Sequence, residues 1–315
     1  MSSSAIAPVP GTGAVAPPAP RRRPRRRHRG YAQTVWWFVL PAAALYAFAV
    51  IVPAVQGSLF AFTDWDGVSA QVNPVGLDQF VAILTDPYGL TAVRNTLIIA
   101  VCVTVFQNLL GLLIALGVNA RIKSRNILRT VFFAPVVITT IAIGFLWQNL
   151  LSPNGAINQA LTGVGLGGLR QNWLGEPTTA LASVIFVVIW QFVGYSMVIF
   201  LAGLQGIPDE VLEASAIDGA GPLRRFWYVV RPMLAPAITI NVMLSVIGGF
   251  KIFDQVFIMT QGGPGGSTNT ISTLIYTNAF QLGRFGYGAA LAIVLTIFVA
   301  AASAVQYRLL SKQEG

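Results

Sequence analysis

The stretch from Glu213 to Pro232, EASAIDGAGPLRRFWYVVRP, is a charged passage between two long apolar segments. The segments on either side of it, 181–204 and 236–259, each have the roughly 20 residues that a helix needs to cross a bilayer. Small residues, charges, glycines and prolines are concentrated in the passage, so it is unsuited to a bilayer core. We expect it to lie in water between two membrane-spanning helices.

The composition indicates a membrane protein. Of 315 residues, 55% are hydrophobic and 10% are charged, whereas soluble domains carry about 25% charged residues. The net charge of +9 is local, because seven arginines fall in one run, 21–29, and it does not argue for nucleic-acid binding. The single cysteine, Cys102, lies in an apolar stretch, which excludes a disulfide framework or a cysteine metal site.

Six apolar windows are long enough to span a membrane, and we predict an all-α fold with six transmembrane helices. Closed barrels need short alternating strands, which these runs are not. Only the fifth window contains charges, Lys251 and Asp254. The windows are 35–57, 95–118, 130–151, 181–204, 236–259 and 287–307.

The segments outside the windows complete the predicted organisation. Residues 1–30 are rich in proline, alanine and arginine and are expected to be a disordered tail. The apolar run that follows exceeds a signal-peptide core, so it is interpreted as an uncleaved anchor. The transmembrane domain then covers 31–310, with a polar connection at 205–235 and a short tail at 311–315.

The distribution of lysine and arginine predicts the orientation. One side of the predicted membrane carries sixteen of these residues and the other carries three, Arg94, Arg170 and Arg284. The bias alternates through six spans, so both termini are expected in the cytoplasm. The arginine run at 21–29 is either a topology signal alone or also a contact with anionic lipid.

The polar connection is expected to form two helices. Pro208, Asp209 and Glu210 suit the start of the first, and Gly219 suits its end. Pro222 can begin a second helix, which would be amphipathic and lie along the membrane surface. Its apolar positions are Leu223, Phe226, Trp227 and Val230. Small residues in the first helix would let a partner approach closely; a helical loop with no partner is the alternative.

These residues resemble a known family. The spacing of EASAIDGAG and the later VVRP is similar to the EAA loop of ABC importer permeases. This sequence departs from the family pattern with Ser215 for alanine, Val229 for isoleucine and Arg231 for leucine. Three further stretches resemble carbohydrate-importer permeases of the larger maltose-permease type: GGFKIFDQVFIMTQGGP (248–264), PVGLDQF (74–80) and RNTL (94–97). The similarity covers 35–310.

The resemblance implies a type I ABC importer permease fold and a set of partners. A coupling helix would dock on a separate ATPase, and the ATPase would bind ATP and magnesium. Two ATPase copies, a second permease subunit and an extracytoplasmic solute-binding protein would complete the transporter. The docking residues implied are Glu213, Ala214, Ser215, Asp218 and Gly219.

The chain itself is not expected to hydrolyse ATP or to bind a cofactor. A P-loop needs Gly-Lys followed by Ser or Thr. The three lysines, Lys123, Lys251 and Lys312, are each preceded by a residue other than glycine. One histidine and no carboxylate cluster also make covalent or metal catalysis improbable, so we predict a transport subunit in the cell membrane.

Two groups of residues are candidates for the substrate pathway. Lys251 and Asp254 are three residues apart, which on a helix would place them on one face, as a structural pair or a substrate contact. Trp190, Gln191 and Tyr195 combine aromatic and polar groups, and the resemblance favours this span as part of a sugar site. Packing between helices is the alternative.

Several alternatives remain open at this point. Gln107, Asn108 and the segment 145–150 are weaker pathway candidates, and the outer loop 260–270 is either a docking surface or a flexible connector. The favoured function is sugar import by alternating access. A glycerol-phosphate or polyol importer would need a cationic cavity, and a secondary transporter would use Lys251 and Asp254 as an ion relay. The sequence does not specify which sugar is carried.

Overall fold

The computed structural model describes residues 39–120 and 122–310, which are helical apart from loops and one isolated bridge between Thr63 and Pro74. The contacts divide the chain into a unit that ends at Pro53 and a larger unit that begins at Ala54. The predicted tails 1–30 and 311–315, the arginine run and the start of the first window lie outside the described residues.

Four helices are long and apolar enough to cross a membrane: Val39–Phe62, Pro87–Asn119, Pro177–Gln205 and Phe285–Arg308. The first includes α2 (Val52–Leu59), the second joins α4 (Pro87–Cys102) to α5 (Asn108–Asn119) through a π-helical turn, the third is α9 and the fourth lies in α16 (Phe285–Leu310). The count reaches six if each of two bent helix pairs is one span. This agrees with a multi-pass helical fold, and the six-span count stays a prediction.

The second span begins eight residues before the predicted window. Asp86 accepts a hydrogen bond from the backbone N–H of Tyr88 at 3.0 Å, and Pro87 occupies the first helical turn. Both features favour a helix start, so the sequence did contain the signal that the window missed.

The third predicted span, 130–151, is not one straight helix. It divides into α6 (Arg125–Val137) and α7 (Thr140–Leu150), which are bent by 99°. Ile138 is extended, with φ −78° and ψ 137°, and Thr139 caps α7 by accepting from the N–H of Ala142. Pro135 lacks a backbone N–H and cannot donate within α6, which weakens the helix just before the break.

The fifth predicted span, 236–259, is also interrupted. Helix α13 (Ala235–Phe250) ends before Lys251, and a short helix, α14 (Asp254–Thr260), follows. Lys251 and Asp254 therefore do not share a helix face, and the predicted pairing on one helix is wrong. Two glycines near the end of α13 weaken the helix, and Asp254 favours a new start because an acid stabilises a helix N-terminus.

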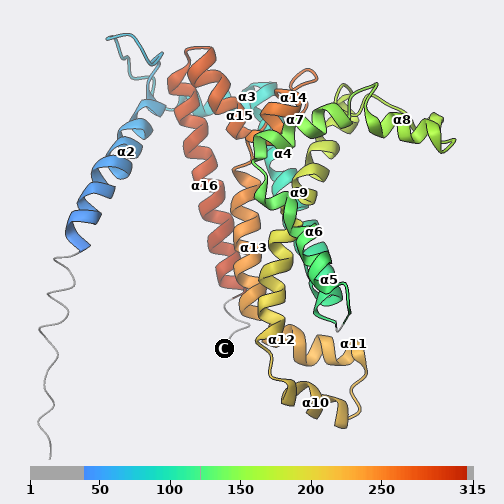
Figure 1. Cartoon of the computed structure of the whole chain (residues 1–315). Helices are drawn as coiled ribbons and strands as arrows, with labels where there is room; N and C mark the ends of the chain where they lie inside the picture. The colour runs from blue at the N-terminus through green and yellow to red at the C-terminus, as the bar shows by residue number, and fades with distance from the viewer. Residues whose placement is uncertain (1–38, 121, 311–315) are drawn as a thin grey trace, which may run out of the picture. The chain divides into compact units, whose positions relative to one another are not determined.

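Shorter helices occupy the two ends of the larger unit. Figure 1 shows α3 (Asp78–Thr85), α14 and α15 (Ile271–Tyr276) at one end of α9 and α13. Helix α8 (Ala156–Gly163) follows α7, and a π-helical turn, Thr277–Gln281, extends α15. At the other end the connecting loop, residues 206–234, contains α10 (Asp209–Ile217), α11 (Pro222–Arg225), a π-helical turn and α12 (Arg231–Met233).

Close helix contacts depend on small residues and on buried amides. An added Cβ on Gly194 of α9 would collide with the backbone carbonyl of Phe132 in α6, so only glycine allows this approach. Gln107 donates to the hydroxyl of Ser196 at 2.8 Å, and Asn108 donates to the hydroxyl of Ser245 at 2.8 Å. These bonds join the second span to α9 and α13. Cys102 is half-buried.

The loop at residues 260–270, predicted to face outwards, is held by hydrogen bonds within the loop and to a neighbouring segment. The side-chain amide of Asn95 donates to the carbonyls of Ser267 and Asn269 at 2.8 and 3.0 Å. Thr260 and Thr268 join their hydroxyls at 2.7 Å. These bonds fix the backbone at several points, which favours an ordered loop over a flexible connector, and the docking role stays a prediction.

Candidate functional site

A cavity of about 560 Å³ lies where the two helix breaks meet the middle spans. Its size is within the range of small-molecule sites, about 300–1,000 Å³. Its walls come from the second span, both helices of the third, α9, and the segment that crosses from α13 to α14. The lining residues are Val103, Gln107, Val136, Thr140, Val188, Phe192, Tyr195, Leu244, Ser245, Ile247, Gly248, Gly249, Lys251, Ile252, Phe253, Asp254 and Gln255.

The lining combines ring faces with polar groups. Phe192, Tyr195 and Phe253 contribute aromatic surface, and Phe253 is itself stacked on Phe257 with ring centroids 5.1 Å apart. Lys251 and Asp254 are both exposed at this cavity. The break thus brings a cation and an anion to one cavity, although the two do not share a helix face.

Gln191 supports the break from behind and is not a cavity-lining residue. It is 1% exposed, and its Oε1 accepts a hydrogen bond from Nε2 of Gln255 at 2.9 Å. Its Nε2 donates to the carbonyl of Ile138 at 3.4 Å, which is one of the groups that the third-span break releases. The amide of Gln191 therefore links α9 to both breaks, as the packing alternative for this residue proposed.

Of the other two predicted pathway residues of α9, one lines the cavity and one does not. Tyr195 is 39% exposed and lines the cavity. Trp190 is half-buried, packs edge-on against Trp147 with ring centroids 5.2 Å apart and does not line the cavity. Gln107 lines the cavity and Asn108 is buried beside it. Trp147, from the weaker segment 145–150, packs with Trp190.

Sequence reasoning missed Gln255 and Thr140. Gln255 lay inside a window that was interpreted as one continuous span, and its bond to Gln191 joins positions 64 residues apart. A polar residue in an apolar window was the available signal. The backbone at both breaks is tolerated at membrane depth because it lines a cavity or is buried in protein; the carbonyl of Ile252, for example, accepts from the hydroxyl of Thr270 at 3.3 Å.

Helix α10 is the second candidate site, and it is exposed along one face. Glu213, Ala214, Asp218 and Gly219 are exposed. Ser215 instead is 7% exposed and donates its hydroxyl to the carbonyl of Leu212 at 2.7 Å. The structure therefore brings four of the five predicted docking residues to the surface and turns the fifth towards the protein.

The end of α10 follows the pattern that its glycine predicts. Gly219 has φ +75°, a left-handed conformation that favours glycine. The N–H of Gly219 donates to the carbonyl of Ala216 at 3.1 Å, and the N–H of Ala220 donates to that of Ser215 at 3.0 Å. This pair of backbone hydrogen bonds is a Schellman motif, which ends the helix sharply.

Ile217 is the residue of α10 that the sequence did not single out. Its side chain is 86% exposed, next to Asp218 on the surface. This exposed apolar side chain on a helix with small neighbours is available to enter an apolar groove on a protein partner. Leu212, on the opposite face, packs into the apolar cluster that includes Phe200, Leu204 and Leu234.

No three histidine, cysteine, aspartate or glutamate side chains gather to hold a metal ion within 39–120 and 122–310. The two sites thus consist of a cavity between broken helices and an exposed helix at the far end of the same spans. A cavity lined by interrupted helices among apolar spans is an arrangement that membrane transport components use.

The comparison with protein families then gives the particular class. The binding-protein-dependent transport system inner membrane component family matches residues 107–314, and the chain belongs to that family. The resemblance to ABC importer permeases is thereby confirmed. Members of this family are transport components of a membrane, which agrees with the apolar helices described above.

Curated relatives align over most of the chain. The multiple sugar-binding transport system permease protein MsmF of Streptococcus mutans is 33% identical over 279 residues, which are 89% of this chain and 96% of that protein. The probable starch degradation products transport system permease protein AmyD of Thermoanaerobacterium thermosulfurigenes is 34% identical, covering 89% of this chain and 94% of that protein. The trehalose/maltose transport system permease protein MalF of Thermococcus litoralis is 30% identical, covering 83% and 88%.

A solved structure shares the fold. A chain of a bacterial ABC transporter that imports the acidic polysaccharide alginate aligns with a TM-score of 0.75 and 22% identity, covering 88% of this chain and 96% of that one. The shared fold supports the helical ABC importer permease architecture predicted from the motifs.

Proposed function

We propose that this chain is the membrane-spanning subunit of an ATP-driven importer that carries a neutral sugar or oligosaccharide into the cytoplasm by alternating access. The exposed face of α10, at the opposite end of α9 and α13 from the break that leads to α14, is the observation that carries the proposal. A separate protein that binds such a helix can move α9 and α13 together.

Helix α10 is coupled to the two spans by the contacts of its buried face. Leu212 of α10 packs with Phe200 and Leu204 of α9 and with Leu234 at the start of α13. A partner that displaces α10 therefore displaces the adjoining ends of α9 and α13 together. The middle of α9 and the far end of α13 line the cavity, so a rigid-body movement at the α10 end of these helices changes access to the cavity.

The partner in this mechanism is a cytoplasmic ATPase, present in two copies, that binds ATP and magnesium. Glu213, Ala214, Asp218 and Gly219 face it, and Ile217 enters an apolar pocket on it. A short helix in a groove is a common mode of recognition. A second permease subunit and an extracytoplasmic solute-binding protein complete the assembly, and both chain termini lie in the cytoplasm. The description of the family as binding-protein-dependent supports the solute-binding protein as a partner.

The cavity favours a neutral, hydroxyl-rich solute. Phe192, Tyr195 and Phe253 offer ring faces, while Lys251 and Asp254 offer a donor and an acceptor whose formal charges cancel. A phosphorylated polyol would need a net cationic cavity, so that alternative is not favoured. The sugar-transport names of the relatives at 30–34% identity support the same choice.

The test is uptake by the complete transporter in liposomes. The double substitution Glu213→Lys with Ile217→Asp removes the docking anchor, and we expect ATP-dependent sugar uptake to fall at least about 30-fold, as a lost hot spot of about 2 kcal/mol implies. Copurification of the ATPase should be lost as well. Val164→Asp is the matched control, because Val164 is 70% exposed but lies after α8. Uptake by this chain alone on an ion gradient, without an ATPase, would contradict the proposal.

A further inference from the structure

The second half of the connecting loop forms a helical segment that runs across the direction of the following span. Residues Pro222–Met233, here called the crossing helix, are bent by 72° from Ala235–Phe250. If Ala235–Phe250 crosses the bilayer, the crossing helix lies close to the plane of the membrane. This placement rests on the proposed function, which sets the loop at the cytoplasmic surface.

The side chains of the crossing helix divide between protein and surroundings. Val230 packs into the apolar cluster below the loop, and Phe226 is half-buried. Leu223, Trp227 and Tyr228 are 73%, 52% and 77% exposed. Such side chains on a surface helix are typical of the region where lipid headgroups meet acyl chains: leucine is apolar, and the rings of tryptophan and tyrosine are apolar at one end and polar at the other.

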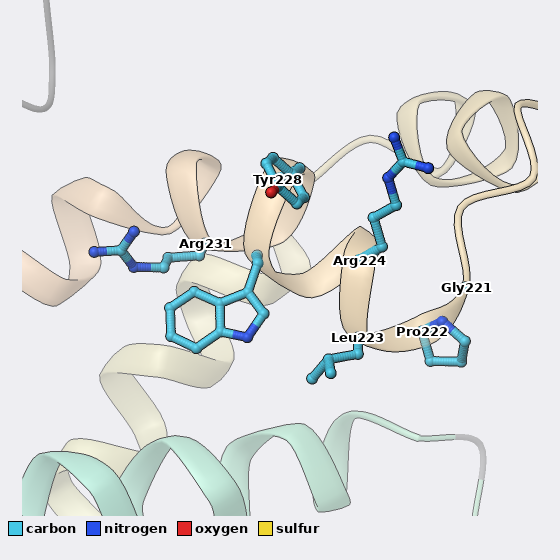
Figure 2. A pocket seen from close by; sticks show the side chains of 7 residues that line it. Gly221, Pro222, Leu223, Arg224, Tyr228 and Arg231 are labelled. Carbon is cyan, nitrogen blue, oxygen red and sulfur yellow. The ribbon is translucent and has the colours of Figure 1, made fainter.

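Arginines accompany these exposed aromatic side chains. The guanidinium carbon of Arg231 lies 5.3 Å from the centroid of the Trp227 ring, which keeps the guanidinium beside the ring. A hollow of about 690 Å³ is lined by Gly221, Pro222, Leu223, Arg224, Trp227, Tyr228 and Arg231. The lining contains two cations and no acid. In Figure 2, Leu223 and Arg224 leave the helix on opposite sides, and Arg231 extends from its far end.

The charge of the connecting loop is segregated between its two helical segments. Residues 209–218 contain four acids and no lysine or arginine, whereas 222–233 contain three arginines and no acid. A single partner surface of one sign cannot be attracted to both. Because α10 carries the acids and the apolar anchor Ile217, it matches a protein partner, and the crossing helix matches an anionic surface.

We propose that the crossing helix is a binding site for an anionic phospholipid of the cytoplasmic leaflet. Arg231, which lies beside the Trp227 ring, holds the headgroup phosphate, and Arg224 at the other end of the segment adds to the positive charge that attracts the lipid. Leu223 and Trp227 enter the boundary of the acyl chains. Guanidinium groups suit phosphate because their N–H donors match its oxygens. The bound lipid fixes one segment of the loop to the bilayer surface, while the other segment, α10, remains available to the ATPase.

The experiment measures lipid contact at Trp227 in the full chain, reconstituted in nanodiscs of phosphatidylcholine with phosphatidylglycerol. Either lipid carries bromine atoms that quench nearby tryptophan, and the quenching attributable to Trp227 is the difference between the protein and its Trp227→Phe variant. We expect brominated phosphatidylglycerol to quench Trp227 at a lower mole fraction than brominated phosphatidylcholine. Arg224→Gln with Arg231→Gln should raise the required fraction about 30-fold, given about 1 kcal/mol for each of the two arginines near an anionic surface.

The controls separate the possible occupants. Arg170→Gln removes one exposed arginine from the loop after α8 and should leave the quenching unchanged. Millimolar inorganic phosphate should not displace the lipid; displacement would mean a soluble-anion site and overturn the proposal. Equal quenching by the two lipids, or no effect of the double substitution, would also overturn it, as would loss of quenching when an ATPase binds. No outcome depends on transport, so the proposed function can fail independently.

Discussion

The fourth and fifth predicted spans, 181–204 and 236–259, are both largely apolar in sequence, yet they fold differently. Helix α9 stays helical for 29 residues, from Pro177 to Gln205. Helix α13 stops after 16 residues, and three residues intervene before α14. The continuous helix supplies close packing and hydrogen bonds, whereas the broken one supplies the charges of the cavity. In this pair of helices the buried amides and hydroxyls lie within the helix, whereas the two charged side chains lie where the backbone leaves it.

The packing of the continuous helix can be broken at Gly194. Gly194→Val adds a branched side chain where the carbonyl of Phe132 already lies, so we expect a loss of stability of about 3 kcal/mol. The measurement is the thermal unfolding midpoint of the purified chain in detergent. Gly117→Val is the matched control, because a Cβ there meets nothing within 4 Å. Equal midpoints for the two variants would show that α6 and α9 do not approach so closely.

The link between the two kinds of span is tested at Gln191. Gln191→Leu leaves the Gln255 amide and the Ile138 carbonyl without this partner, at an expected cost of about 1–3 kcal/mol in stability. Gln191→Leu with Gln255→Leu should recover part of this loss, because both buried amides are then replaced. Gln205→Leu, at the exposed end of α9, is the control. Additive losses in the double variant would contradict the bond.

How much of this difference could be predicted from sequence depends on the kind of interaction. The apolar run of α9 and the left-handed end of α10 at Gly219 follow from local patterns, and the structure agrees with both. The break after Phe250 did not follow, because apolar composition constrains burial and not backbone dihedrals. Lys251 and Asp254 were recognised as unusual, but their arrangement was wrong because it assumed a continuous helix.

The cavity illustrates the same limit. Tyr195, predicted as a substrate-pathway residue, lines the cavity, whereas its neighbour Gln191 is buried; the role of each in the pathway stays a prediction. Which side of α9 faces the cavity depends on contacts with α6 and α14, and those contacts join residues far apart in sequence. Ile217 shows the converse case, since an apolar residue in a small-residue helix gave no sign of being exposed.

Asp254, at the break after α13, provides a test of whether this segment binds the transported sugar. Asp254→Ala removes an acceptor for a sugar hydroxyl, so we expect the KM for ATP-driven uptake to rise about tenfold with little change in the maximal rate, the effect of one lost charged hydrogen bond. Glu176→Gln, at an exposed carboxylate next to the start of α9, should change neither value. A drop in the maximal rate alone would assign Asp254 to conformational change and not to binding.

The smallest expected effect is at Asp66, in the loop that follows the first candidate span, Val39–Phe62. Backbone N–H groups of Ser69 and Val68 donate to the carboxylate of Asp66 at 2.7 and 2.9 Å and lower its pKa from the ordinary 3.8. A lowered folded-state pKa contributes stability above the unfolded value, which is lost as the pH falls through the folded value. Asp66→Asn should therefore flatten the decline of the unfolding midpoint at acidic pH and leave its slope near neutrality unchanged.

The central claim, that the solute passes through the cavity at the two breaks, is tested most directly by thiol labelling during transport. Tyr195→Cys places the only thiol in the cavity once Cys102 is replaced by serine, and Val68→Cys places one in the loop between Phe62 and Asp78, where Val68 is 91% exposed. We predict that the transported sugar, with ATP and the ATPase present, protects position 195 from a water-soluble thiol reagent and leaves position 68 reactive. Labelling of position 195 at the same rate with and without sugar would contradict the claim.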